Sequence, residues 1–232
     1  MVEPQRKQAA IAPLTASALC WRWIGACAVA ELIGMSAAAS AAAGSVYLGI
    51  DDSSSAAPLN ALAYLLFVLA GAIEGAALGY FQGRVLHQVI SNFNRTHWLG
   101  ACTAIAVLGW GLGMIAPIFG SDANPSIDEP SPTMALLFMV IIGIGAGLLI
   151  GAVQAVLLAR CVSESWRWIP ANMLGWGLAF LAIQIGASLP SEDWAIPFYV
   201  LDGLLTGAIA GALLGLATAP VLLRFRRAQH NT

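Results

Sequence analysis

The chain has 232 residues, a formal net charge of −2 and a hydrophobic content of 59%. Charged residues make up only 9% of it, against roughly 25% in soluble domains, and the mean hydropathy is +0.80. These values exclude a soluble globular protein and predict an all-α polytopic membrane protein.

Six apolar segments are long enough to cross the hydrocarbon core of a bilayer, which is roughly 30 Å thick and takes about 20 helical residues. They lie at 23–47, 59–86, 98–119, 134–159, 168–189 and 199–223. The connections between them are rich in Ser, Pro, Asp and Asn, which favour turns. We therefore predict that residues 1–232 form one membrane domain with six transmembrane helices.

Residues 21–90 contain the first two spans, which we predict to form a helical hairpin. The outward helix begins with Trp23, and the returning helix carries glycines at every fourth position, Gly71, Gly75 and Gly79. Glycines four apart lie on one face of a helix and let a neighbouring backbone approach closely within a membrane. The triplet is therefore predicted to be a packing surface.

The remaining spans repeat this hairpin twice, within residues 97–161 and 166–227. Trp98 and Trp168 begin the two outward helices. The returning helices again carry glycine triplets, at Gly143, Gly147 and Gly151 and at Gly207, Gly211 and Gly215. Because the three hairpins run in the same direction, we expect parallel repeats about a pseudo-threefold axis along the membrane normal.

Tryptophans gather where the outward helices begin. Indole rings favour the boundary between lipid and water, so we expect these side chains to anchor the bundle at the membrane interface. The predicted anchors are Trp21, Trp23, Trp98, Trp166 and Trp168.

Basic residues lie only in or beside the termini and the second and fourth connections, whereas every charged residue of the other three connections is an acid. The positive-inside rule then places both termini in the cytoplasm, for a protein of the cell (inner) membrane. We expect flexible cytoplasmic tails at 1–15 and 226–232. Basic helix ends of this kind suit anionic lipid headgroups rather than nucleic acid. The basic residues are Arg6, Lys7, Arg22, Arg84, Arg95, Arg160, Arg167, Arg224, Arg226 and Arg227.

Four polar residues inside the spans are predicted to form hydrogen bonds between helices. The alternative is that they line a transport pathway. They are Gln82, Gln154, Asn172 and Thr218. Asn172 has the same position in its helix as Cys27 and Cys102, and two thiols without a nearby buried histidine predict no metal site.

Glu31 and Glu74 depart from the repeat, because the equivalent positions in the other two hairpins hold Ala or Trp. Counted at about 1.5 Å per residue from Arg22 and Arg84, both lie roughly 14–15 Å deep, near the membrane midplane. An ionised carboxylate there costs roughly 2.5–3.5 kcal/mol on insertion scales, so such residues usually face the bundle interior or a wet cavity. If the first two helices pack through these faces, the two carboxylates meet and share a proton.

Three interpretations of this pair remain open. In the first, Glu31 and Glu74 form a proton or cation site. In the second, they are a protonated or hydrogen-bonded pair that only fixes helix packing. In the third, one of them faces a partner subunit or a defect in the headgroup layer.

No enzyme signature is present. The sequence lacks H-E-x-x-H and G-x-S-x-G motifs, and no histidine lies inside a predicted span, so we predict no catalytic site, cofactor or metal. The Trp-led hairpins with their G-x-x-x-G-x-x-Q runs resemble uncharacterised bacterial six-helix integral membrane proteins. That resemblance covers most of the chain and implies no activity.

Two functions from different classes are compatible with this sequence. One is a small proton- or cation-linked transporter or channel that uses Glu31 and Glu74. The other is a non-catalytic structural or accessory membrane subunit whose glycine-rich faces bind helices of a partner subunit or of a second copy. A continuous polar cavity that reaches both carboxylates would favour transport, and a dry, closed core would count against it.

Overall fold

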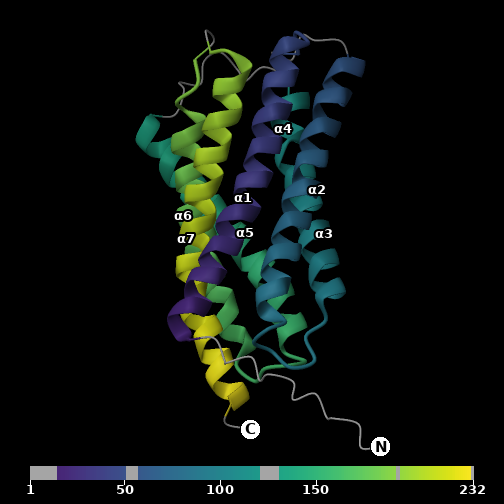
Figure 1. The fold of residues 1–232 in the computed structure, drawn as a ribbon. Coiled ribbons are helices and arrows are strands. Elements are labelled where there is room, and N and C mark those ends of the chain that lie inside the picture. Colours follow the sequence, from purple (N-terminus) through teal and green to yellow (C-terminus); the bar gives the residue numbers. More distant parts are fainter. Residues whose placement is uncertain (1–14, 51–56, 121–130, 192–193, 231–232) are drawn as a thin grey trace, which may run out of the picture.

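A computed structural model describes residues 15–50, 57–120, 131–191 and 194–230. Over these residues the protein is all-helical, with no strands. Six of its helical segments are long and apolar enough to cross a membrane, which suits a lipid bilayer environment. They run side by side as one elongated bundle, with the start of α1 and the end of α7 at the same end (Figure 1).

The helices follow the spans predicted from the sequence, with differences at their ends. The elements are α1 (Ala16–Tyr47), α2 (Ala57–Leu86), α3 (Arg95–Gly113), α4 (Ile115–Phe119), α5 (Pro132–Leu158), the 3₁₀ turn η1 (Ser165–Arg167), α6 (Trp168–Ala187) and α7 (Ile196–His230). The prediction of six spans in these positions is confirmed as regards helix number, length and apolar composition.

Both outer ends of the chain are more helical than expected. Helix α1 begins seven residues before Trp23, where the side chain of Thr15 accepts a hydrogen bond of 3.1 Å from the backbone N–H of Ala18. Residues 226–230, predicted to be part of a flexible tail, instead continue α7. That helix extends because Phe225 is buried against the ring of Trp168, with 5.9 Å between ring centroids. Most of the predicted N-terminal tail lies outside the described residues.

The third span is not one continuous helix. Helix α3 ends at Gly113, and after Met114 the short α4 follows. Proline disrupts a helix because its ring clashes with the carbonyl group four residues earlier. Pro117 lies four residues after Gly113, so the break falls where this clash would occur.

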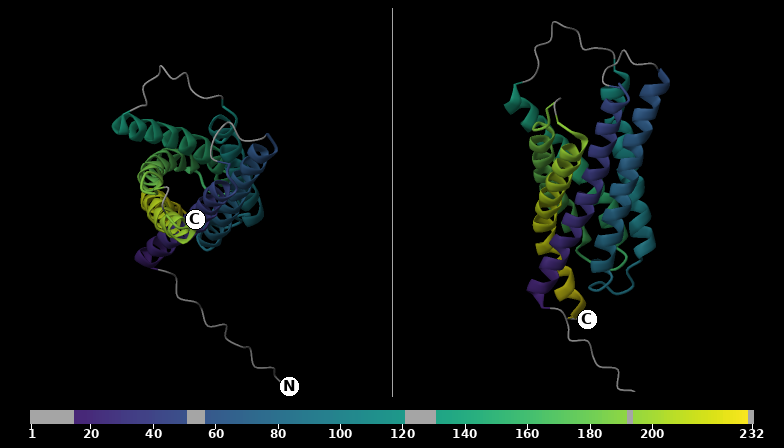
Figure 2. Two further views of the ribbon diagram at one scale, coloured as in Figure 1. Left: turned by 90° about the horizontal axis from the view of Figure 1, so that it is seen from above. Right: turned by 45° about the horizontal axis from the view of Figure 1, so that its top comes forward.

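The helices follow one another around the bundle in the order α3, α2, α1, α7, α6, α5. Contact between α1 and α7 joins the first and last spans of the chain. By contrast, α3 and α5 stand at the two ends of this series and contact each other only sparsely. Seen from above and with the top turned forward, α5 leans away from the other helices towards its beginning (Figure 2).

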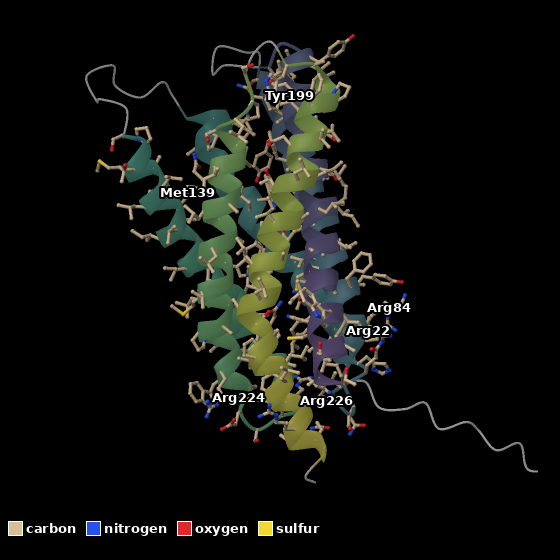
Figure 3. All side chains as sticks on the ribbon, turned by 60° about the vertical axis from the view of Figure 1, so that its left-hand side comes forward. Arg22, Arg84, Met139, Tyr199, Arg224 and Arg226 are labelled. Atoms are coloured by element: carbon tan, nitrogen blue, oxygen red, sulfur yellow. The ribbon has the colours of Figure 1, made fainter. Side chains whose placement is uncertain are left out.

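The two ends of the bundle differ in charge. All eight arginines that the structure describes lie in or next to the helix turns at the end where α1 begins and α7 terminates. Figure 3 shows Arg22, Arg84, Arg224 and Arg226 towards this end and Tyr199 at the opposite one. We call these the basic end and the distal end.

Three of the five predicted interface tryptophans are instead buried in the core. Trp23, Trp98 and Trp168 are at most 1% exposed, and the ring of Trp168 lies 5.6 Å from that of Trp23 and 6.3 Å from that of Trp98, centroid to centroid. Buried indoles need a partner for their N–H group. The indole N–H groups of Trp23 and Trp168 have such a partner on another helix, as described below, and therefore do not need water at the membrane interface. Trp21 and Trp166 are exposed, as anchors require.

Each glycine triplet faces the backbone of a neighbouring helix. Those on α2, α5 and α7 lie against α3, α6 and α1, respectively. A Cβ atom placed on Gly75 would lie 2.6 Å from the carbonyl oxygen of Cys102. At Gly147 and Gly211, the middle glycines of the other two triplets, it would overlap the carbonyl oxygens of Asn172 and Cys27. Only glycine permits these approaches without moving a helix.

Two glycines of α5 test this packing. We expect Gly147→Ala to destabilise the protein by about 1–3 kcal/mol, because the added methyl group overpacks the contact with the α6 backbone. Gly145 has no atom of another helix within 4 Å of its Cβ position, so Gly145→Ala should leave stability unchanged or raise it by up to about 1 kcal/mol. Thermal unfolding of the two variants in detergent measures the difference, and equal melting temperatures would contradict the packing role.

Candidate functional site

Glu31 lies in the core of the bundle on α1. Its side chain is fully buried, at 0% exposed. Neither carboxylate oxygen has a hydrogen-bond partner among the residues that the structure describes. Because buried polar groups in proteins nearly always have such a partner, an unsatisfied carboxyl group is exceptional.

Glu74 lies on α2 and is almost as deeply buried, at 7% exposed. Its Oε2 accepts a hydrogen bond of 2.7 Å from Nε1 of Trp110 on α3. The stem of the side chain packs on Gly34, where an added Cβ atom would lie 2.7 Å from the Cβ of Glu74. Gly34 is three residues after Glu31, so the two glutamates occupy the same part of the interface between α1 and α2.

The structure brings both glutamates to one helix interface, as the predicted proton sharing requires. Glu74 accepts a hydrogen bond from Trp110, and no donor reaches the Glu31 carboxylate within the described parts of the chain. That the two carboxyl groups share a proton stays a prediction. The indole N–H of Trp110 draws the Glu74 carboxylate towards α3.

Trp110 is a site residue that the sequence analysis did not single out. One signal in the sequence points to it, and the structure shows how the ring is accommodated. An indole in the middle of an apolar span needs an acceptor for its N–H. Gly71, the first glycine of its triplet, provides the space for this ring, because a Cβ atom there would lie 2.6 Å from Cγ of Trp110.

Three of the four predicted polar residues form hydrogen bonds between helices. Nε2 of Gln82 donates to the thiol sulfur of Cys27 on α1 over 3.4 Å. Thr218 on α7 accepts a hydrogen bond of 2.7 Å from the indole of Trp23. Gln154 on α5 connects two helices, as described next.

Gln154 and Asn172 complete this polar layer next to the tryptophan rings. Nε2 of Gln154 donates to the sulfur of Cys102 over 3.4 Å, and its Oε1 accepts a hydrogen bond of 2.7 Å from the indole of Trp168. Asn172 differs, because its amide group donates within α6 to the carbonyl oxygen of Trp168 over 2.9 Å. These bonds satisfy the core indoles of Trp23 and Trp168.

A cavity of about 430 Å³ lies between α2, α3, α5 and α6, where α3 and α5 diverge. Glu74 and Trp110 form part of its wall. Three further lining residues are polar, Gln82, Gln154 and Asn172. Most of the others are aliphatic or aromatic, and Glu31 is not among them. The cavity is therefore mainly apolar and reaches one of the two carboxylates.

The cavity extends to the surface of the bundle. Ile142 on α5 lines it and is 39% exposed. Gly109 on α3 also lines it, and no atom of another helix lies within 4 Å of its Cβ position. Met139, a third lining residue, lies towards the distal end of α5 (Figure 3). The opening therefore lies on the lateral face between α3 and α5, which the apolar helices turn towards lipid.

Comparison with known protein families, curated proteins and solved structures finds no match to this chain. Its function is therefore inferred from the geometry of the site.

Replacing the two glutamates by methionine should change stability in opposite directions. Glu31→Met removes a buried carboxyl group that has no partner, so we expect it to stabilise the protein by about 1–3 kcal/mol. Glu74→Met leaves the N–H of Trp110 without its acceptor, so a loss of about 1–3 kcal/mol is expected. Thermal unfolding in the same detergent compares them, and a change of the same sign in both variants would contradict this account.

Proposed function

We propose that this protein is a small proton- or cation-linked membrane transporter with Glu31 and Glu74 as its coupling site. The observation that carries the proposal is the unpartnered carboxyl group of Glu31 in the core. A carboxylate that only fixed helix packing would have hydrogen-bond partners. Without them, its charge has to be balanced by a proton or by a bound cation.

The position of Glu74 supports a role in exchanging protons and cations with the surroundings of the protein. Its carboxylate lines the cavity, whereas Glu31 lies behind it in the same interface. Glu74 is thus the group that meets an entering cation, and Glu31 is the buried group that holds a proton nearby. The mainly apolar wall does not resemble a water-filled ion pore. This favours a carrier over a channel.

The bundle that holds this site is, in our proposal, three parallel hairpins related by a pseudo-threefold axis. Each glycine triplet packs on the first helix of the next hairpin, and the last triplet packs on the first hairpin. The hydrogen bonds from Trp23 to Thr218 and from Trp168 to Gln154 are equivalent in this scheme. The third position departs from this scheme, because Nε1 of Trp98 and Oε1 of Gln82 have no hydrogen-bond partner among the described residues.

The charge difference between the bundle ends supports an orientation with both termini in the cytoplasm. The described arginines all lie at the basic end, and the positive-inside rule places that end inside the cell. Entry then occurs through the lateral opening of the cavity, in its distal half near Met139.

The proposal is tested with purified protein in vesicles that enclose a pH-sensitive dye. With an acidic interior, external addition of Na⁺, K⁺ or ethidium should accelerate the loss of protons beyond protein-free vesicles for at least one cation. Glu31→Gln and Glu74→Gln should each lower this rate by about tenfold or more, because neither amide can exchange a proton for a cation.

Glu164→Gln is the matched control. Glu164 lies outside the spans and pairs with Arg167 over 3.0 Å, so its replacement should leave the rate unchanged. If none of the three cations moves protons, or if both core variants exchange like the unaltered protein, the transporter proposal is wrong.

An accessory membrane subunit is the second candidate function. The observation that favours it is the apolar outer face of α5, where large side chains such as Phe138 and Ile141 are more than 60% exposed. A subunit of this kind would show no proton exchange in vesicles. The same measurement therefore separates the two candidates.

A further inference from the structure

The seam between α3 and α5 is open at the depth of Glu74, where the seam between α1 and α2 is filled. Helices α1 and α2 contact each other extensively, as do α6 and α7, whereas α3 and α5 contact each other only sparsely. The space beside Gly34 on α1 is filled by the side chain of Glu74, whereas Gly109 on α3 has no atom of another helix within 4 Å of its Cβ position. The cavity between α3 and α5 is therefore an opening at a depth where the equivalent seam is packed.

The size of this opening suits an organic molecule. Small-molecule pockets typically measure about 300–1,000 Å³ and are lined mainly by apolar and aromatic groups with a few polar ones. At about 430 Å³, this cavity lies within that range, and its wall includes the aromatic rings of Trp110, Trp176 and Phe180. A small inorganic cation would need a shell of oxygen ligands, and most of the residues in this wall carry no side-chain oxygen.

The charge of the cavity wall determines which sign of charge its occupant carries. Glu74 is the one acid among the described residues that line it, and none of them is Lys, Arg or His. Aromatic faces attract a cation, and this attraction grows when the cation is desolvated. A carboxylate beside aromatic rings in an apolar cavity therefore complements a cation with a large apolar body.

We propose that the cavity binds an apolar organic cation of the quaternary ammonium or phosphonium kind, which enters laterally between α3 and α5. Its charge lies at the Glu74 carboxylate beside Trp110, and its apolar body fills the space towards Met139 and Ile142. The proposal rests on the proposed function, because it names the substrate class of the same site.

The charge of the bound cation is balanced by the release of a proton from Glu74. When Glu74 carries a proton, arrival of the cation releases that proton to water and leaves a carboxylate–cation pair, with no other bond changed. The hydrogen bond from Trp110 persists in both forms, because the indole donates to either a carboxylate or a carboxyl oxygen. This exchange couples one cation to one proton without a further reactant.

Tetraphenylphosphonium is the probe for this site, and tetraphenylborate is its control of equal shape and opposite charge. We expect the purified full-length protein to bind tetraphenylphosphonium and to release one proton per bound cation into a weakly buffered detergent solution. Tetraphenylborate should not compete. Glu74→Gln should weaken binding by roughly thirtyfold or more, as expected for loss of a buried charge partner.

Two substitutions that fill the cavity test whether the cation binds there. Gly109→Phe places a ring in the cavity from α3, and Ile142→Trp fills the same cavity from α5. Two variants are used so that the result does not depend on the folding of one. Each should weaken binding by tenfold or more while thermal stability is retained. Gly100→Phe is the matched control, because Gly100 is an exposed glycine of the same helix, also with nothing within 4 Å, and does not line the cavity.

Several results would overturn the inference. Equal binding of tetraphenylborate would show that the cavity takes apolar molecules regardless of charge, such as lipid chains. Unchanged affinity in Glu74→Gln, or in both filled variants when stably folded, would place the cation elsewhere. No binding of the probe together with Na⁺- or K⁺-driven proton exchange would refute this substrate class and leave the transporter proposal intact. Probe binding with proton release but no exchange in vesicles would support the site and refute transport.

Discussion

Close approach of helix backbones at the three glycine triplets determines where every other group in this bundle lies. The triplets bring α2 onto α3, α5 onto α6 and α7 onto α1, at separations that a single methyl group would disturb. These three pairs are therefore the tightly joined units of the structure. Side chains pack in the seams between α1 and α2 and between α6 and α7, whereas the seam between α3 and α5 holds the cavity.

The polar groups follow from this division into pairs and seams. Glu31 and Glu74 lie in the seam between α1 and α2, and the cavity lies in the seam between α3 and α5. Trp110 connects the two, because it belongs to α3, lines the cavity and holds the Glu74 carboxylate. Trp110 thus joins the open seam to Glu74 by one hydrogen bond.

Much of this architecture could be predicted from the sequence, because its signals are local. The six spans follow from hydropathy, and the packing surfaces follow from glycines four residues apart. The burial of Trp23 could not be predicted in the same way, because its indole partner, Thr218, is 195 residues away. The same holds for the open seam, which depends on the tilt of α5 relative to α3. Local sequence placed both glutamates at one depth, but the hydrogen-bond partner of Glu74, Trp110, belongs to a third helix and could not be predicted from local patterns.

The unequal lengths of the helices have a consequence for the depth of the bundle in the membrane. Helix α7 has 35 residues, which at 1.5 Å per residue is about 52 Å, against a hydrocarbon thickness of roughly 30 Å. Tilt absorbs part of this mismatch, and the rest of the helix has to project into the headgroup layer. The last turns carry Arg224, Arg226 and Arg227, so this end projects, and its charges prevent the bundle from sliding inward along the membrane normal.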